Sequence, residues 1–435
     1  MKINILLLTL LSVVSAIPVQ NNVESLPSLT NSELTPISEL SDLENLPINV
    51  DDEISIEEED DSDYETNELN SFTATKDNVK ILGRALYLDD INSLWFGLTN
   101  TGVEYKFNGK ITSLSITADT GSSSIDNPAR IVIYADDSLY LDTFTTEVEN
   151  EFVVEFRESA EHTVRLMKIS ECTCGTLRLN EIKADSNIIE PTMAASKKIE
   201  FIGDSITSAY GIDAPEGTFS SKTEDGTKTY AYKTAQKFNA DSSMVSFSGF
   251  GIISGYSDNG VRDTFSTVPH FYDKLGVSYF NFYNKTASMH EVEWDANEFK
   301  PDLIVINLGT NDSSYIRNIK EEERKISEAD AYADEYEKFI GQIRSIHPDA
   351  EILCTLGIMG QELYYEVEKA VNNYRANTGD MKVNAFKFNN QDIEKNGKNI
   401  DWHPAPQSHI DAAHELVNEI EKRYGWVSDS NVNID

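Results

Sequence analysis

The sequence predicts an α/β fold in which a parallel five-stranded sheet is flanked by helices and is preceded by a small antiparallel β-sandwich of the jelly-roll kind. Two patterns predict this arrangement. Short β-rich runs recur from residue 79 to 185, whereas apolar strands alternate with helical stretches over residues 196–427. Regular short strands favour an antiparallel sandwich, and strand–helix alternation favours a parallel sheet. With 435 residues, of which 40% are hydrophobic, the chain can build both cores.

The first sixteen residues have the composition of a secretory signal peptide. A lysine at position 2 precedes an apolar stretch, and Val14, Ser15 and Ala16 form a small-residue cleavage pattern. The stretch is too short to span a membrane, and the sequence has no other run of about 18 apolar residues. We therefore expect a secreted, extracellular protein whose signal peptide is 1–16.

Residues 17–75 are predicted to form a disordered acidic leader. The segment contains sixteen Asp or Glu residues and no Lys or Arg, and its acidic run at 51–63 repels itself. The formal net charge of the whole chain is −38. This charge argues against nucleic acid and anionic membranes as partners, but it is compatible with a neutral polysaccharide.

The sandwich domain is predicted for residues 79–185. Its β-rich runs include VKILGRALYL near the start and TLRLNEI near the end, and turn residues such as Asn108-Gly109 separate the runs. The polar, proline-containing segment 185–196 that follows predicts a linker.

The second domain, residues 196–427, is predicted to contain the site. Ligands of open α/β sheets bind beyond the carboxyl ends of the strands, so polar residues that follow a strand are the candidates. Strands are expected at 199–202, 243–247, 303–308, 351–357 and 383–388, and helices at about 228–238, 329–346, 362–377 and 407–423.

Ser205 follows the first of these strands. The apolar run ends in Gly203-Asp204-Ser205, a glycine turn that delivers the serine hydroxyl to the edge of the sheet. Asp204 is expected to support the loop by hydrogen bonding rather than to act as an acid. The triplet alone is a weak signal, and a serine near neutral pH is a poor nucleophile unless a base lies beside it.

Three later segments supply the groups that such a serine needs. An apolar alternation after the second strand ends in Gly249 and Gly251, where backbone N–H groups can approach a substrate oxygen. Asn311 follows the third strand, and its amide can donate to a developing oxyanion. His403 precedes the last helical pattern and can reach Ser205 as a general base.

The order of these motifs, GDS, a glycine block, GTND and a late DWHP, resembles the SGNH (GDSL-type) hydrolase superfamily. The DWHP form and the upstream sequence GRALYLDDINSLWFGLTNTGVEYKF resemble carbohydrate esterase family two. The similarity covers about residues 79–427. It implies a secreted acetyl esterase or acetylxylan esterase that removes O-acetyl groups from plant cell-wall polysaccharides, such as acetylxylan or acetylated glucomannan, through an acyl-enzyme.

The resemblance also implies roles for individual residues. Ser205 is the expected nucleophile and His403 the expected base. Gly251 and Asn311 are expected to form an oxyanion hole together with the backbone N–H of the serine, and Gly249 is the alternative glycine.

Two arrangements can orient His403. Many members of the superfamily carry an aspartate three residues before the histidine, but Ile400 occupies that position here. Asp401 lies two residues before His403, and residues two apart in an extended segment share a face, so its carboxylate can accept from Nδ1. Alternatively a main-chain carbonyl orients the ring and leaves a Ser-His dyad. Trp402, beside the base, either stacks on a substrate sugar or packs under the loop in the core.

No metal or organic cofactor is expected. The sequence contains no HExxH or similar spacing of metal ligands. It also lacks the G-x-S-x-G turn that carries the nucleophile in α/β-hydrolases, because Ser205 is followed by Ile-Thr-Ser. Cys172, Cys174 and Cys354 imply no disulfide framework and are expected to be small buried side chains.

The expected partner is an acetylated polysaccharide or oligosaccharide, and the sequence does not predict the oligomeric state. Two alternative functions remain open. A GDSL-type lipase or lysophospholipase would use the same chemistry but would need an apolar acyl groove. A non-catalytic glycan-binding protein would bind polysaccharide without releasing acetate.

Overall fold

The computed structural model of the chain describes residues 69–278 and 288–435. The predicted signal peptide and most of the predicted acidic leader lie outside these residues. Residues 70–72, inside the predicted leader, form strand β1 (Asn70–Phe72), which pairs antiparallel with β9 (Leu177–Ala184). The main-chain hydrogen bonds of a short edge strand require no apolar pattern, so the composition of this segment did not predict it.

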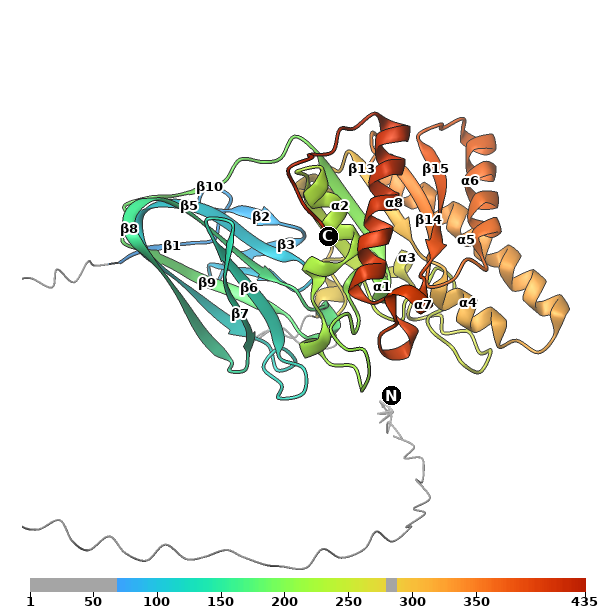
Figure 1. Ribbon diagram of the computed structural model, residues 1–435, viewed down its shortest axis with the longest axis horizontal. Coiled ribbons are helices and arrows are strands. Elements are labelled where there is room, and N and C mark those ends of the chain that lie inside the picture. The colour runs from blue at the N-terminus through green and yellow to red at the C-terminus, as the bar shows by residue number, and fades with distance from the viewer. Residues whose placement is uncertain (1–68, 279–287) are drawn as a thin grey trace, which may run out of the picture. The chain divides into compact units, whose positions relative to one another are not determined.

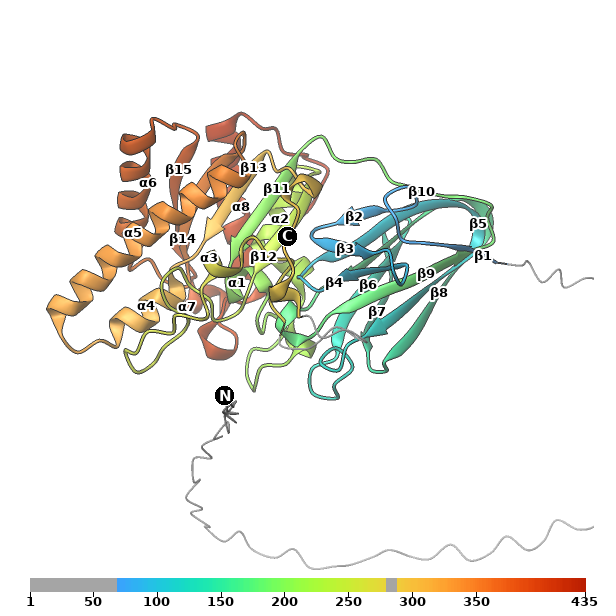
Figure 2. The same cartoon turned by 180° about the vertical axis from the view of Figure 1, so that it is seen from behind.

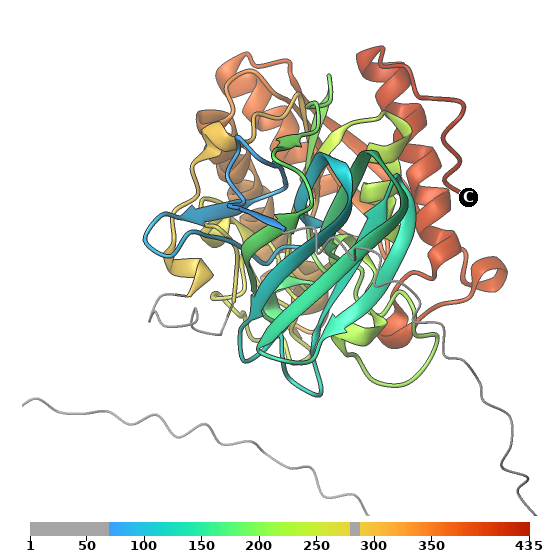
Figure 3. The same cartoon turned by 90° about the vertical axis from the view of Figure 1, so that its left-hand side faces the viewer.

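The amino-terminal domain is the expected antiparallel β structure (Figure 3). Its main path is β3-β4-β9-β5-β8-β6-β7, and β1, β2 and β10 pair with β9 or β5. Buried side chains such as Leu94, Val103 and Leu114 form its core. Besides β1 and β9, the strands are β2 (Lys80–Leu82), β3 (Ala85–Leu88), β4 (Ser93–Phe96), β5 (Thr101–Ala118), β6 (Ala129–Ala135), β7 (Ser138–Thr145), β8 (Glu149–Lys168) and β10 (Ile189–Pro191).

The predicted linker, 185–196, is only partly a connection. Its middle forms β10, which pairs with Tyr105–Phe107 of β5 and therefore belongs to the first domain. The proline at the end of this strand is tolerated because β10 lies at an edge of the ladder.

The second domain contains the five predicted strands in one parallel sheet, in the order β12-β11-β13-β14-β15 (Figures 1 and 2). Helices α2 and α8 pack against one face of this sheet, and α5 and α6 pack against the other. The strands are β11 (Lys198–Gly203), β12 (Asp241–Ser246), β13 (Leu303–Asn307), β14 (Glu351–Ile358) and β15 (Val383–Asn390).

The four predicted helices are present as α2 (Tyr230–Lys237), α5 (Glu322–Ile346), α6 (Tyr364–Thr378) and α8 (Pro406–Tyr424). Helix α5 begins seven residues earlier than expected because its first turns are exposed and carry no apolar stripe. In the part of the chain that the structure describes, no helix is long and apolar enough to cross a membrane. The short helices are α1 (Ser205–Ser208), α3 (Val268–Phe271), α4 (Thr310–Arg317) and α7 (Ile393–Asn396).

The strand order places the candidate site residues at one edge of the sheet. The chain leaves β11 for its neighbour β12 and then crosses to β13 on the opposite side of β11. The crevice beyond the carboxyl ends of the strands at such a switch point is where open α/β sheets bind ligands. Ser205, the loop 247–251 and Asn311 follow these three strands directly.

A buried ion pair connects the two domains. Nη2 of Arg84, which lies between β2 and β3, is 3.3 Å from Oε2 of Glu200 on β11, and each side chain is 1% exposed. Arg84 also donates to the carbonyl oxygen of Tyr272 at 2.6 Å, and the Tyr272 hydroxyl donates to Glu200 at 2.7 Å. Charges so far from water are stable only when such partners surround them.

We predict that Arg84→Met lowers the free energy of unfolding by about 3–5 kcal/mol, because it leaves the carboxylate of Glu200 buried without its cation. Denaturant unfolding measures this loss. The control is Lys110→Met, which breaks an exposed ion pair with Glu155 and should cost less than about 1 kcal/mol. Equal losses in the two variants would contradict the importance of the buried pair.

Candidate active site

Ser205 lies at the carboxyl edge of the parallel sheet. β11 ends at Gly203, and α1 begins at Ser205. Asp204 caps this helix, since its carboxylate accepts a hydrogen bond of 3.0 Å from the N–H of Ile206. The turn requires glycine at 203 because a Cβ there would clash with Thr207. Asp204 therefore supports the loop, as expected.

The imidazole of His403 lies against the serine hydroxyl. Nε2 is 2.8 Å from Oγ of Ser205, although the two residues are 198 positions apart. His403 follows the 3₁₀ turn Ile400–Trp402 and precedes α8. Its Nδ1 lies 3.2 Å from the carbonyl oxygen of Ile400. If Nδ1 carries the proton and donates to that carbonyl, Nε2 is left to accept the serine proton.

The surroundings of His403 keep its ring neutral. The residue is 8% exposed. Burial lowers the pKa of the imidazole to about 4. The ring of Tyr210 packs on it with a centroid distance of 4.4 Å, and Tyr210 in turn stacks on Phe219 at 4.2 Å. An uncharged imidazole at hydrogen-bond distance from a hydroxyl can act as a general base.

Asp401 does not contact Nδ1 of His403 as the first of the two arrangements expects. Its carboxylate accepts a hydrogen bond of 2.8 Å from the hydroxyl of Tyr210. The expectation assumed an extended backbone, but Asp401 and Trp402 have φ angles of 51° and 67°, in the left-handed region. This tight turn removes the two-residue alternation and places the Ile400 carbonyl at Nδ1. The geometry therefore matches the alternative with a main-chain carbonyl.

Asn311 and Ser205 each bring an amide donor to this edge. Asn311 is 6% exposed in the first turn of α4, and its side-chain amide donates one N–H to the carbonyl oxygen of Phe250 at 2.8 Å. The same amide carries a second N–H. The backbone N–H of Ser205 has no hydrogen-bond partner among the described residues, which is usual for the first turn of a helix.

Gly251 does not present the oxyanion N–H that the sequence predicts. Its N–H donates to the carbonyl oxygen of Ser266 at 3.1 Å. Glycine is required at 251 for space, because a Cβ would clash with Ser254 and with the carboxylate of Asp312. Gly249, the alternative, has φ of +82°, and within 69–278 and 288–435 its N–H has no hydrogen-bond partner. Gly249 is therefore the better candidate donor.

Trp402 is a surface residue next to the base. Its side chain is 60% exposed, so the alternative of a core tryptophan is wrong. The ammonium group of Lys398 lies over the indole ring. The carbonyl oxygen of Trp402 accepts a hydrogen bond of 2.8 Å from the side chain of Gln391. The face of this exposed indole opposite Lys398 is apolar and suited to a sugar ring.

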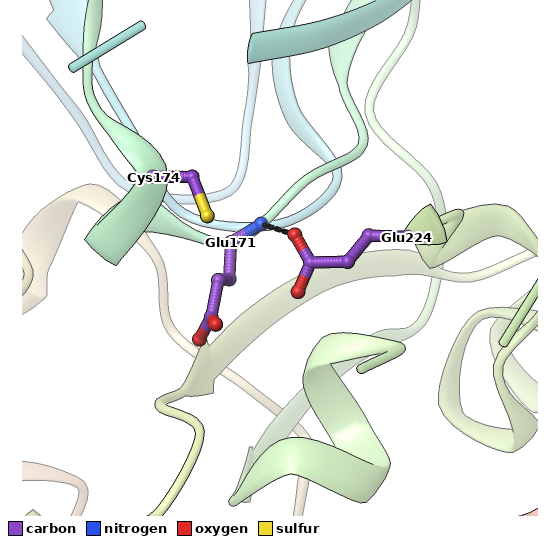
Figure 4. Close-up of side chains that lie close together, drawn as sticks. All are labelled: Glu171, Cys174 and Glu224. Atoms are coloured by element: carbon purple, nitrogen blue, oxygen red, sulfur yellow. Dashed lines mark hydrogen bonds between the residues drawn. The ribbon is translucent and has the colours of Figure 1, made fainter. Parts of the chain in front are cut away.

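Glu171, Cys174 and Glu224 form a buried cluster in which one ligand atom from each lies within 4.8 Å of the others (Figure 4). Two carboxylates and a thiolate can bind a divalent cation. Here, however, the buried ammonium group of Lys168 donates to the Glu171 carbonyl oxygen at 2.7 Å, and burial raises the pKa of the Cys174 thiol, which opposes thiolate formation. The cluster therefore fits a metal ion poorly. Cys172, Cys174 and Cys354 are all buried and free, as expected.

Two residues that shape the site were not assigned from the sequence. Tyr210 contacts both His403 and Asp401 and lies five residues after Ser205, a spacing that gives only a weak hint. Asp312 accepts hydrogen bonds from three consecutive backbone N–H groups, and its place beside Asn311 in GTND was the available signal. The donors are Ile252, Ile253 and Ser254, at 2.7–3.1 Å.

Both domains match known families. Residues 199–416 match the GDSL-like lipase/acylhydrolase family, and residues 81–191 match the amino-terminal domain of carbohydrate esterase 2. A cellulase/esterase of Acetivibrio thermocellus is 29% identical over 364 residues, which are 82% of this chain and 41% of that protein. An acetylxylan esterase / glucomannan deacetylase of Cellvibrio japonicus is 24% identical over 360 residues, 82% of this chain and 92% of that protein.

Solved structures show the same architecture. An acetyl xylan esterase from the rumen bacterium Butyrivibrio proteoclasticus superimposes with a TM-score of 0.72 at 24% identity, over 82% of this chain and 99% of that one. A family two carbohydrate esterase from Clostridium thermocellum in complex with cellohexaose gives a TM-score of 0.66 at 26% identity, over 80% of this chain and 100% of that one.

We predict that the imidazole of His403 remains neutral until the pH falls to about 4, because protonation would place a cation in a buried site. NMR titration of histidine-labelled protein measures the midpoint, and loss of the resonance in His403→Gln identifies it. A midpoint at the reference value of about 6.5 would contradict the effect of burial.

Proposed function

The chain belongs to the GDSL-like lipase/acylhydrolase family, and we propose that it is a secreted serine esterase that removes O-acetyl groups from plant cell-wall polysaccharides. The observation that carries this proposal is the 2.8 Å contact between Oγ of Ser205 and Nε2 of His403. The substrate class is supported by the relatives named acetylxylan esterase / glucomannan deacetylase.

In the first half of the reaction, Oγ of Ser205 attacks the carbonyl carbon of the acetyl group while Nε2 of His403 accepts the hydroxyl proton. The electron pair of the carbonyl moves to its oxygen and gives a tetrahedral oxyanion. The bond from the carbonyl carbon to the sugar oxygen then breaks, and His403 returns the proton to that oxygen. The products are a free sugar hydroxyl and an acetyl ester on Ser205.

In the second half, His403 takes a proton from a water molecule, whose oxygen attacks the acetyl carbon of the acyl-enzyme. The bond to Oγ of Ser205 breaks, His403 protonates the serine, and acetate leaves. The carbonyl oxygen of Ile400, 3.2 Å from Nδ1, can hold the ring in the same orientation through both halves. The proposed catalytic group is thus a Ser-His dyad.

The oxyanion would be bound by the backbone N–H groups of Ser205 and Gly249 and by the side-chain amide of Asn311. The first two have no partner within the described ranges, and the Asn311 amide is held in place by its bond to Phe250. Such donors act most strongly where water is excluded, and Asn311 is largely buried.

The polysaccharide would lie across the exposed side of this edge. The indole of Trp402 offers a stacking surface one residue from the base. A neutral, acetylated polysaccharide is also compatible with a net charge of −38, which would repel an anionic one. Residues 1–16, which lie outside the described residues, support export of the protein to where such substrates occur.

We predict that Ser205→Ala and His403→Ala each lower kcat for acetate release from acetylated xylan and glucomannan by about 10⁴–10⁶-fold, because each removes one half of the proton-transfer pair. Enzymatic determination of acetate measures the loss. His414→Ala, which changes an exposed histidine of α8, is the matched control. Full activity in Ser205→Ala would refute the assignment, and a preference for octanoyl over acetyl nitrophenyl esters would favour a lipase instead.

We expect Asn311→Ala to lower kcat by about 10²–10³-fold, since it removes a donor to the oxyanion. Steady-state kinetics on an acetyl nitrophenyl ester tests this. Asn318→Ala, at the residue that follows α4, removes a half-buried amide that donates a hydrogen bond to the carbonyl oxygen of Ser314, and it should leave kcat within about threefold. Equal activity of the two variants would argue against an oxyanion role for Asn311.

A further inference from the structure

The peptide that carries the Gly249 N–H is anchored on both sides. On the amino side, the N–H of Ser248 donates to the carboxylate of Glu171 at 3.0 Å. On the carboxyl side, the carbonyl oxygen of Gly249 accepts from the N–H of Tyr256 at 2.8 Å. Glycine has little intrinsic preference for one backbone conformation. The direction of the Gly249 N–H therefore depends on these two anchors.

One of the anchors comes from the other domain. Glu171 follows β8 of the sandwich domain and directly precedes the 3₁₀ turn Cys172–Cys174. The residue is 2% exposed, so its carboxyl group is enclosed between the sandwich domain and the loop after β12. Glu171 thus accepts a hydrogen bond from Ser248, the neighbour of the candidate oxyanion donor Gly249, although it lies more than 70 positions upstream.

Glu171 is itself held firmly. Its backbone N–H donates to Oε2 of Glu224 at 3.0 Å, a bond drawn in Figure 4, and its carbonyl oxygen accepts from Nζ of Lys168 at 2.7 Å. Lys168 and Glu224 are fully buried. Two buried side chains therefore fix, through these hydrogen bonds, the backbone from which the Glu171 carboxyl group extends.

The charge of Glu171 is compatible with a neighbouring oxyanion. A fully ionised carboxylate would oppose negative charge developing on the substrate. Burial raises the pKa of Glu171, which favours its neutral form, and a neutral carboxyl group adds no negative charge beside the oxyanion. Either form keeps a carboxyl oxygen that accepts the Ser248 N–H.

On the basis of the proposed esterase function, we propose that Glu171 is a positioning residue that holds the Ser248–Gly249 peptide so that the Gly249 N–H is directed at the oxyanion. The sandwich domain then contributes to acetyl transfer without touching the reacting atoms. It fixes the direction of the Gly249 N–H dipole. This direction determines how strongly the N–H group stabilises the oxyanion in the transition state.

The experiment compares Glu171→Ala, Glu171→Leu and Glu171→Gln with Asn100→Ala in the full-length chain. Asn100 makes another buried hydrogen bond between the domains, to the carbonyl oxygen of Gly226 at 2.9 Å. It has no hydrogen bond to the loop 247–251 within the residues that the structure describes. For each variant, kcat and KM are measured with an acetyl nitrophenyl ester, together with the midpoint of thermal unfolding.

We expect Glu171→Ala and Glu171→Leu to lower kcat by about 10–100-fold while KM changes by less than about twofold, since only a transition-state contact is loosened. Glu171→Gln should restore kcat to within about threefold, because its amide oxygen accepts the same hydrogen bond. Asn100→Ala should lower the unfolding midpoint without a comparable loss of kcat. If the alanine variant does not fold, the leucine variant, which keeps the volume, provides the comparison.

The proposal is overturned if the Glu171 variants lose no more kcat than Asn100→Ala, or if Glu171→Gln is as slow as Glu171→Leu. If the wild-type protein still releases acetate, either of these results leaves the proposed esterase function unaffected. If the wild-type protein releases no acetate, the esterase function fails, and the positioning role fails with it.

Discussion

β11 pairs with β12 on one side and with β13 on the other, and the positions of the candidate catalytic groups follow from this pairing. In both ladders the partner of Gly203 is the last residue of the neighbouring strand, Ser246 or Asn307. The three strands therefore end at the same level. A loop of a few residues is then enough to bring Ser205, Gly249 and Asn311 to the same edge of the sheet. Only His403 must arrive from a distant part of the chain.

Patterns of neighbouring residues in the sequence predicted the strands and the residues that directly follow them. Apolar runs predicted all five parallel strands, and the position of Ser205 and Asn311 directly after two of them predicted the edge at which they lie. The late motif DWHP predicted that His403 would meet Ser205, and the distance agrees. The strands β1 and β10 were missed because short edge strands depend on main-chain pairing with a distant strand rather than on an apolar pattern.

The details that sequence reasoning missed depend on single backbone angles and on contacts between domains. The partner of Nδ1 could not be chosen without the positive φ of Asp401, which turns a two-residue spacing into a tight turn. The choice between Gly249 and Gly251 as oxyanion donor depends on the hydrogen bond from the Gly251 N–H to the carbonyl oxygen of Ser266, which the sequence does not show. The contact of Glu171 with the loop after β12 joins two domains, and no local pattern encodes it.

The burial of Asn311 also bears on how the chain can be produced. Asn311-Asp312-Ser313 is an acceptor triplet for N-linked glycosylation. In the folded chain the asparagine is only 6% exposed, and its amide nitrogen is bonded to Phe250, so an oligosaccharyltransferase could reach it only before the sheet has formed. A glycan added at that stage has no space in the finished domain. In a eukaryotic secretory pathway, nascent chains that receive a glycan at Asn311 would therefore fail to complete the fold. A bacterial host that lacks this modification would not cause this loss.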